Sequence, residues 1–127
     1  MLYLIVFVGA GIGGALRHGV NVGAARLFGL GFPVGTLIVN VVGSFLMGLA
    51  AGYFALRPGI DQHVRLFLTT GILGGFTTFS AFSLDSALLF ERHAYGLAAA
   101  YIAGSVAASI VALFLGLALF RSAGQLP

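Results

Sequence analysis

The sequence predicts an all-α membrane protein with four transmembrane helices, and three observations carry this prediction. Of the 127 residues, 60% are hydrophobic and only 7% are charged, whereas a soluble domain carries roughly 25% charged residues. The mean hydropathy is +1.11. Four apolar stretches each reach the roughly 20 residues that a spanning helix needs. We expect them at residues 2–25, 33–56, 64–90 and 95–120, in a single transmembrane domain over residues 1–127.

The low charge also excludes several classes of protein. Six basic and three acidic side chains cannot cover a water-facing surface, which argues against a soluble enzyme and a disordered tail. The net charge is only +3 and the basic residues are scattered, so we expect no nucleic-acid partner. The chain has no cysteine, which excludes a disulfide framework and a thiolate nucleophile. We expect a multi-pass protein of the cell membrane, with membrane lipid around it.

The arginines give little information on orientation. An even number of spans places both termini and the second loop on one side of the membrane. That side carries Arg57, Arg65 and Arg121, the other carries Arg26 and Arg92, and Arg17 lies inside the first span. Three against two is too weak a bias to set orientation by the positive-inside rule. Either another feature sets the orientation, or the chain inserts both ways, and we favour the second. A dual-topology chain would form an antiparallel homodimer.

Small and polar residues recur at a spacing of four in three of the spans. Residues four apart share a helix face, and small residues on one face let helices approach closely in lipid. The polar members should face inward or line water, because exposing them to lipid is costly. The stripes are Gly9, Gly13, Arg17 and Asn21; Thr36, Asn40, Ser44, Gly48 and Gly52; and Ala100, Gly104, Ala108, Ala112 and Gly116. In the second span, Asn40 should donate either to a partner helix or to a permeant anion.

The third span contains a sequence that makes a poor helix. Two glycines are followed within two residues by two threonines, and glycine costs about 1 kcal/mol against alanine in a helix interior. We expect a break near Gly74–Thr78. Carbonyl groups released at a break inside the membrane are natural ligands for a hard cation. The alternative is a plain glycine kink packed against a neighbouring helix.

Aromatic and hydroxyl side chains follow the expected break. Phe79 and Phe82 are three residues apart and share a face. They either fill the core or line an anion path with the positive edges of their rings. In the fourth span Tyr101, Ser105 and Ser109 form one stripe. These serines either bond back to their own helix or contribute to the same path.

The sequence gives little support for catalysis, and we expect no enzyme. His18, His63 and His93 lie in different segments without ligand-like spacing. Asp85 is the one acid well inside a span. It would be the carboxylate of a proton-coupled pump, or else a partner for Arg17 or a helix-end group near water.

Three motifs, in order, resemble the Fluc fluoride channels, also called CrcB-type proteins. The first is Gly13-x-x-x-Arg17, and the second is the run GTLIVNVVGS from Gly35 to Ser44. The most specific is TGILGGFTTFSAFS, from Thr70 to Ser83, and Gly104-Ser105 also agrees. The resemblance covers essentially the full chain. One departure is Ala81, where the family often has threonine.

The resemblance implies a fold and a set of site residues. The family pairs four-helix protomers as antiparallel, dual-topology dimers with two pores. A structural sodium ion, which is not transported, would be held by the carbonyl groups of Gly74 and Thr77. The residues that would match the fluoride pathway are Asn40, Phe79, Phe82, Thr36, Ser105 and Ser109, with Tyr101 beside them. Arg17 would match the family's first-helix arginine, to which we give a structural or electrostatic role.

These features predict a channel that lets fluoride leave the cell passively when it accumulates inside. The alternative is a small, dual-topology, proton-coupled multidrug exporter, which would want a glutamate in the first span that this sequence lacks. A third possibility is a membrane assembly subunit whose glycines only pack against partners.

Overall fold

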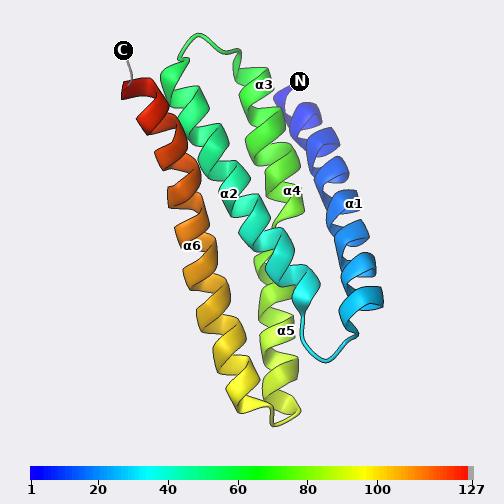
Figure 1. The fold of residues 1–127 in the computed structure, drawn as a ribbon. Helices are drawn as coiled ribbons and strands as arrows, with labels where there is room; N and C mark the ends of the chain where they lie inside the picture. Colours follow the sequence, from blue (N-terminus) through cyan, green and yellow to red (C-terminus); the bar gives the residue numbers. More distant parts are fainter. Residues whose placement is uncertain (126–127) are drawn as a thin grey trace.

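The computed structural model describes residues 1–125, with side chains described as far as Arg121. Four helical segments within it are long and apolar enough to cross a membrane, and they lie side by side (Figure 1). These segments are Leu2–Phe28, Val34–Leu56, Gln62–Glu91 and Tyr95–Arg121. The four expected spans are therefore confirmed, and the chain is a multi-pass membrane protein.

The helices match the expected spans to within a few residues at most of their ends. Helix α1 covers Leu2–Phe28, three residues beyond the expected end at residue 25, and α2 covers Val34–Leu56. Helix α6 covers Tyr95–Gln125. The first connection is therefore shorter than expected, and its Gly29 ends α1 with a φ of 76°, a conformation that glycine adopts without strain.

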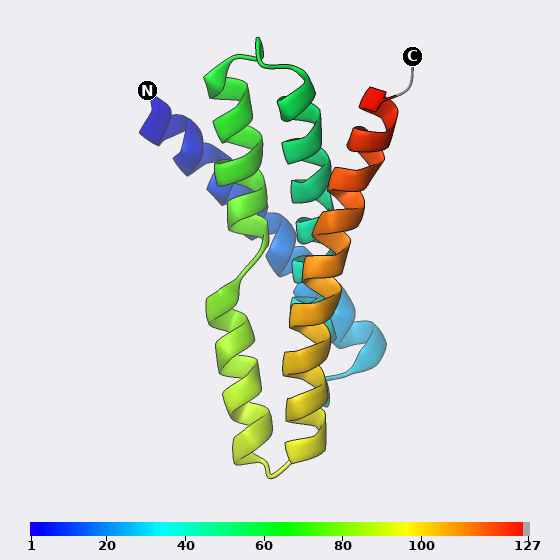
Figure 2. The same ribbon diagram turned by 90° about the vertical axis from the view of Figure 1, so that its left-hand side faces the viewer.

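The third span is divided into two halves, as Figure 2 shows in green. Its first half consists of α3 (Gln62–Leu66), the π-helix η1 (Phe67–Leu73) and the short α4 (Gly74–Phe76). Thr77 and Thr78 are extended, with ψ angles of 157° and 125°. Helix α5 (Phe79–Glu91) forms the second half. The predicted break is confirmed, and it lies at the two threonines rather than at the glycines before them.

Side chains and a turn define the ends of these half-helices. The Asp61 carboxylate accepts the His63 N–H at 3.0 Å and caps α3, and this bond together with the His63 ring lowers the pKa of Asp61. The Thr78 hydroxyl accepts the Ala81 N–H at 3.1 Å and caps α5. At the other end of α5, His93 has a φ of 60°. Its N–H and that of Ala94 return to the last turn of α5, which closes the helix as in a Schellman motif.

Glycines bring the helix backbones into contact in the first half of the molecule. Helix α1 packs on η1 and α4. A methyl group added to Gly9 would lie 2.9 Å from the Gly71 Cα, and one added to Gly13 would overlap the Ile72 carbonyl oxygen. Similarly, a methyl group on Gly48 of α2 would lie 3.1 Å from the Gly116 Cα of α6. The small-residue stripes therefore pack helices together at these positions.

The stripe on α6 packs over only part of its length. Ala112 and Gly116 are buried, whereas Ala100, Gly104 and Ala108 are exposed. An α-helix has 3.6 residues per turn, so each step of four residues rotates a stripe by about 40° around the helix. A stripe this long cannot face one neighbour throughout. In the half nearer Tyr95, the buried face of α6 instead carries Ala98 and Tyr101, which form a core cluster with Leu89 of α5.

Candidate functional site

A pocket of about 310 Å³ lies beside the break in the third span. It brings together five of the residues predicted for the fluoride pathway: Asn40, Phe79, Phe82, Ser105 and Ser109. The other lining residues are Ser44 of α2, the two threonines of the break, and Val106 and Ile110 of α6. Three separate spans therefore contribute amide, hydroxyl and aromatic groups to one space, and the described residues that line it include no arginine.

Asn40 of α2 is bonded in both directions to the backbone of the break. Its Nδ2 donates to the Thr78 carbonyl at 3.0 Å, and its Oδ1 accepts the Thr78 N–H at 2.8 Å. The expectation that Asn40 donates to a partner helix is confirmed. An asparagine amide has two N–H donors, and this pair of bonds uses one of them. The second N–H remains for another acceptor in the pocket.

Two hydrogen bonds at the break, one of them to Asn40, divert N–H groups from the carbonyls that precede them by four residues. In an unbroken helix the Thr78 N–H would bond to the Gly74 carbonyl, and the Ala81 N–H to the Thr77 carbonyl. Here the Thr78 N–H goes to Asn40 and the Ala81 N–H goes to the Thr78 hydroxyl. The carbonyl groups of Gly74 and Thr77 are thus released from helical pairing. Oxygen atoms of this kind suit a hard cation, so the residues fit the sodium ion that the resemblance implies.

A row of aromatic rings leads from the break toward α6. Phe79 and Phe82 share one face of α5, with ring centroids 5.6 Å apart. Phe82 lies 5.3 Å from Tyr101, which in turn meets Phe32 edge-on at 5.5 Å. Phe82 and Tyr101 are part of the packed interior, whereas Phe79 is 77% exposed at the opening of the pocket.

Two serines of α6 present buried hydroxyl groups. Ser105 is 4% exposed, and the Oγ atoms of Ser105 and Ser109 have no partner among the described residues. The alternative in which both serines bond back to their own helix is not what the structure shows. A buried hydroxyl without a partner is costly, so these two groups are available to a guest in the pocket.

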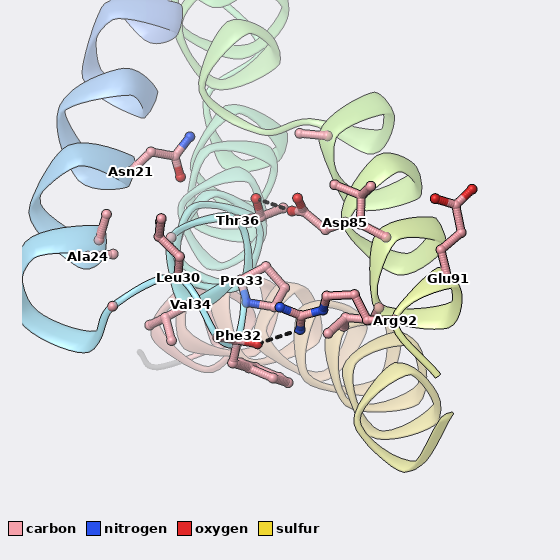
Figure 3. A pocket seen from close by; sticks show the side chains of 17 residues that line it. Asn21, Ala24, Leu30, Phe32, Pro33, Val34, Thr36, Asp85, Glu91 and Arg92 are labelled. Atoms are coloured by element: carbon pink, nitrogen blue, oxygen red, sulfur yellow. Dashed lines mark hydrogen bonds between the residues drawn. The ribbon is translucent and has the colours of Figure 1, made fainter. Parts of the chain in front are cut away.

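Thr36 and Tyr101 lie next to this pocket rather than inside it, and both bond to Asp85. The Thr36 hydroxyl donates to the Asp85 carboxylate at 2.7 Å and the Tyr101 hydroxyl at 3.2 Å. Thr36 and Asp85 line a larger cavity of about 650 Å³ between the ends of α1 and α5 (Figure 3). Tyr101 therefore connects two spaces, because it bonds to a residue of the cavity and stacks on a residue of the pocket.

Of the three roles that the sequence allows for Asp85, a pump carboxylate, a partner for Arg17 or a helix-end group near water, the pairing with Arg17 is wrong. The Asp85 carboxylate accepts hydrogen bonds from Thr36 and Tyr101. Among the described residues, no ion pair joins Asp85 to Arg17. Arg17 is partly buried on α1 and its Nε has no partner among the described residues. The spacing of Asp85 three residues after Phe82 could have indicated its place, since it puts both on one face of α5.

The comparisons with known proteins agree with this architecture. Residues 4–117 match the family described as CrcB-like protein, Camphor Resistance (CrcB). A protein of Rhodopseudomonas palustris (strain BisB5) called fluoride-specific ion channel FluC is 61% identical over 96% of this chain and 98% of its own length. A protein of the same name from Methylobacterium nodulans is 62% identical, over 95% of this chain and 97% of its own. By family match and by these identities, the chain belongs to the CrcB-like protein family.

Proposed function

We propose that this chain forms a fluoride channel, through which fluoride leaves the cell passively. The observation that carries the proposal is the pocket beside the break, whose polar side chains are all uncharged and include hydrogen-bond donors. Fluoride is small and strongly hydrated, so a pore must replace its water with hydrogen-bond donors. The free N–H of Asn40 and the hydroxyls of Ser105 and Ser109 can do so. The chain's relatives named above, which are called fluoride-specific ion channels, support the same function.

Neutral donors also suit release of the ion. A lining of fixed positive charges would hold a small anion tightly, whereas conduction requires several sites from which the ion can leave. The rings of Phe79 and Phe82 add the weakly positive edges that every aromatic ring has. We therefore place the narrow part of the pathway between Asn40, the two rings and the two serines.

We place the route from the larger cavity to this pocket past three hydrogen-bonded residues, Thr36, Tyr101 and Asp85. Thr36 and Tyr101 both point their hydroxyls at Asp85. An anion moving past this carboxylate would be repelled by it. Each hydroxyl has a single O–H, which is donated to Asp85, so it can bind the anion only when it releases the carboxylate. We therefore propose that Thr36 and Tyr101 act between the cavity and the rings of Phe82 and Phe79 by exchanging the Asp85 carboxylate for the passing anion.

The channel is further proposed to be an antiparallel, dual-topology homodimer. Phe79 is 77% exposed in the single protomer, so half of the proposed aromatic lining has no protein cover. Gly104 has open space around it, between exposed Ala100 and Ala108. Small residues exposed on a spanning helix suit close approach of another helix. The near balance of arginines at the two ends supports insertion in both orientations.

A structural sodium ion at the break is part of this proposal. The carbonyl groups of Gly74 and Thr77, released from helical pairing, would hold it together with other oxygen ligands, because a hard cation takes several. When bound, the ion would supply positive potential near the anion path without lying in it. It would also offset the cost of exposing backbone carbonyls at membrane depth.

Fluoride efflux from vesicles tests the proposed activity. Purified protein is reconstituted into lipid vesicles loaded with fluoride, and release is followed after the membrane potential is set. A passive channel releases fluoride to an endpoint that follows the membrane potential and is independent of a proton gradient. Release that follows the proton gradient would instead support the proton-coupled exporter. A folded protein that passes no fluoride would overturn the proposal.

A further inference from the structure

One side chain joins the two walls of the larger cavity. Arg92 follows the last residue of α5, and its Nη2 donates to the Gly31 carbonyl at 2.9 Å, across 61 residues of sequence. Gly31 belongs to the loop between α1 and α2. Both residues line the cavity, and Figure 3 shows the guanidinium reaching across to the loop beside Phe32. The bond lies at the exposed rim, which we call the cavity mouth: the opening between residues 29–33 and the end of α5.

Helices α1 and α5 do not pack on each other, so the bond from Arg92 connects the regions at their ends, as helix contacts do elsewhere in the molecule. Helix α1 packs on η1 and α4 in the other half of the third span, rather than on α5. Helix α5 packs chiefly on α6. The end of α1 and the end of α5 therefore face each other across the cavity of about 650 Å³. The Arg92 side chain crosses that space at its rim.

The first part of the loop on the other side of the mouth, residues 29–31, can change conformation at low cost, whereas Phe32 after it is held by its contact with Tyr101. Gly29 has a φ of 76°, which it adopts freely because it has no Cβ. Neither Gly29 nor Gly31 has a neighbouring atom within 4 Å of the place where a Cβ would be. The loop is thus held neither by backbone strain nor by close packing at these two positions. A side-chain bond to its carbonyl is an effective restraint.

We propose that Arg92 is a positioning residue that sets the width of the cavity mouth. With its bond to Gly31 made, residues 29–31 are drawn against the end of α5 and the mouth is narrow. With the bond broken, these residues move away from α5 and the mouth widens. The inference rests on the proposed function in one respect: the cavity leads to Thr36 and Asp85, which lie on the proposed fluoride route, so its mouth would control access to that route. The movement itself is measurable without any fluoride flux.

The absence of native cysteine allows a direct measurement. Ala81 lines the cavity wall, so Ala81→Cys places a single thiol there. Its labelling rate is measured in reconstituted full-length protein with two neutral, water-soluble reagents, a small methanethiosulfonate and a bulky maleimide. Arg92→Met keeps the aliphatic stem and removes the donor. We expect the bulky reagent to react about fivefold faster, the change that loss of one ordinary hydrogen bond produces, and the small reagent to change much less.

Three further variants distinguish a change in the width of the cavity mouth from other causes of faster labelling. Arg26→Met removes an equal charge at the same end without touching the cavity lining and should leave both rates unchanged. Arg92→Lys keeps a charged donor and should restore slow labelling by the bulky reagent. A thiol introduced by Gly59→Cys, in the opposite loop, should be labelled at the same rate with and without Arg92→Met.

Each other outcome overturns the proposal. An unchanged bulky-reagent rate in Arg92→Met would show that the bond does not set the mouth. An equal rise with Arg26→Met would assign the effect to charge, and an equal rise with both reagents would show general loosening of α5. Should Arg92→Met not fold, Arg92→Gln, whose shorter side chain reaches less far, carries the same prediction. Because no fluoride is measured, a failure here is distinct from a failure of the efflux test.

Discussion

Asn40 and Thr78 exchange two hydrogen bonds, so that the side chain of one span takes the place of helical backbone in another. The bonds measure 3.0 and 2.8 Å. Asn40→Leu removes both and leaves the Thr78 N–H and carbonyl without their partner, at a cost of about 1–3 kcal/mol for each group. We expect a large loss of stability, measured by unfolding in detergent.

Asn40→Asp separates stability from conduction. An aspartate still accepts the Thr78 N–H, but when ionised it neither donates to the carbonyl nor offers an N–H to fluoride. A hydrogen bond to an ion is worth about 1.5–3 kcal/mol, so efflux should fall by roughly tenfold to a hundredfold. Normal efflux from folded Asn40→Asp protein would remove Asn40 from the pathway.

Phe79→Ile tests the aromatic lining. Isoleucine keeps most of the bulk but lacks the positive ring edge, and Phe79 is exposed enough in the protomer for folding to continue. We expect fluoride efflux to fall by about tenfold or more, equivalent to about 1.4 kcal/mol, with an unchanged elution volume in size-exclusion chromatography. The matched control is Phe114→Ile on α6, 59% exposed and outside the pocket. Equal efflux from both variants would show that ring edges do not matter.

Removal of sodium tests the proposed cation site. If the carbonyls of Gly74 and Thr77 bind sodium, its replacement by a large organic cation should weaken the proposed dimer and slow efflux, and readdition should restore both. The measurement combines size-exclusion chromatography with efflux from vesicles at matched ionic strength. Assembly and efflux that are indifferent to sodium would leave the break as a structural kink.

Gly74 and Gly75 are neighbours with different surroundings, which makes them a matched pair. A methyl group on Gly75 would overlap the Ala10 backbone, whereas one on Gly74 has the Thr69 carbonyl oxygen as its nearest neighbour, at 3.5 Å. Gly75→Ala should lower the free energy of unfolding by about 1–3 kcal/mol. Gly74→Ala should fold at least as well, since alanine favours helix by about 1 kcal/mol. Unfolding in detergent measures both, and the reverse order would contradict the packing of α1 on α4.

His93 occupies a left-handed conformation, with a φ of 60°. Its Nδ1 lies 2.8 Å from the Tyr95 hydroxyl, an exposed contact that is worth little. His93→Gly removes a conformational cost of about 1 kcal/mol and should raise the free energy of unfolding by up to that amount. His93→Ala keeps the strain and loses the contact, so it should be less stable than the native chain. If both variants had the same stability, backbone strain at this turn would be negligible.

Much of this architecture can be predicted from the sequence because it depends on local chemistry. The spans follow from runs of apolar residues, the break from glycines and threonines close together, and the meeting of Phe79 and Phe82 from their spacing on a helix. The bonding of Asn40 to a neighbouring helix follows from the cost of an unpaired amide in the membrane.

The contacts that the sequence did not reveal join residues far apart in the chain. Asp85 receives hydroxyls from Thr36 and Tyr101, 49 and 16 residues away. Their pairing depends on how α2, α5 and α6 pack, which no local pattern encodes. The same is true of Arg92 and Gly31. The α6 stripe turns outward at Gly104 because residues four apart stay on one helix face for only a few turns.

The bond between Asn40 and Thr78 also bears on how the protein is made. The second span leaves the ribosome before the third, so its amide is already in the membrane when the broken segment arrives. Without that amide, the third span would carry unpaired backbone groups into hydrocarbon, each costing several kcal/mol. The helical hairpin of α2 and the third span is therefore the natural unit of membrane insertion. Once α2 is in the membrane, Asn40 can pair with the Thr78 backbone as soon as the third span enters.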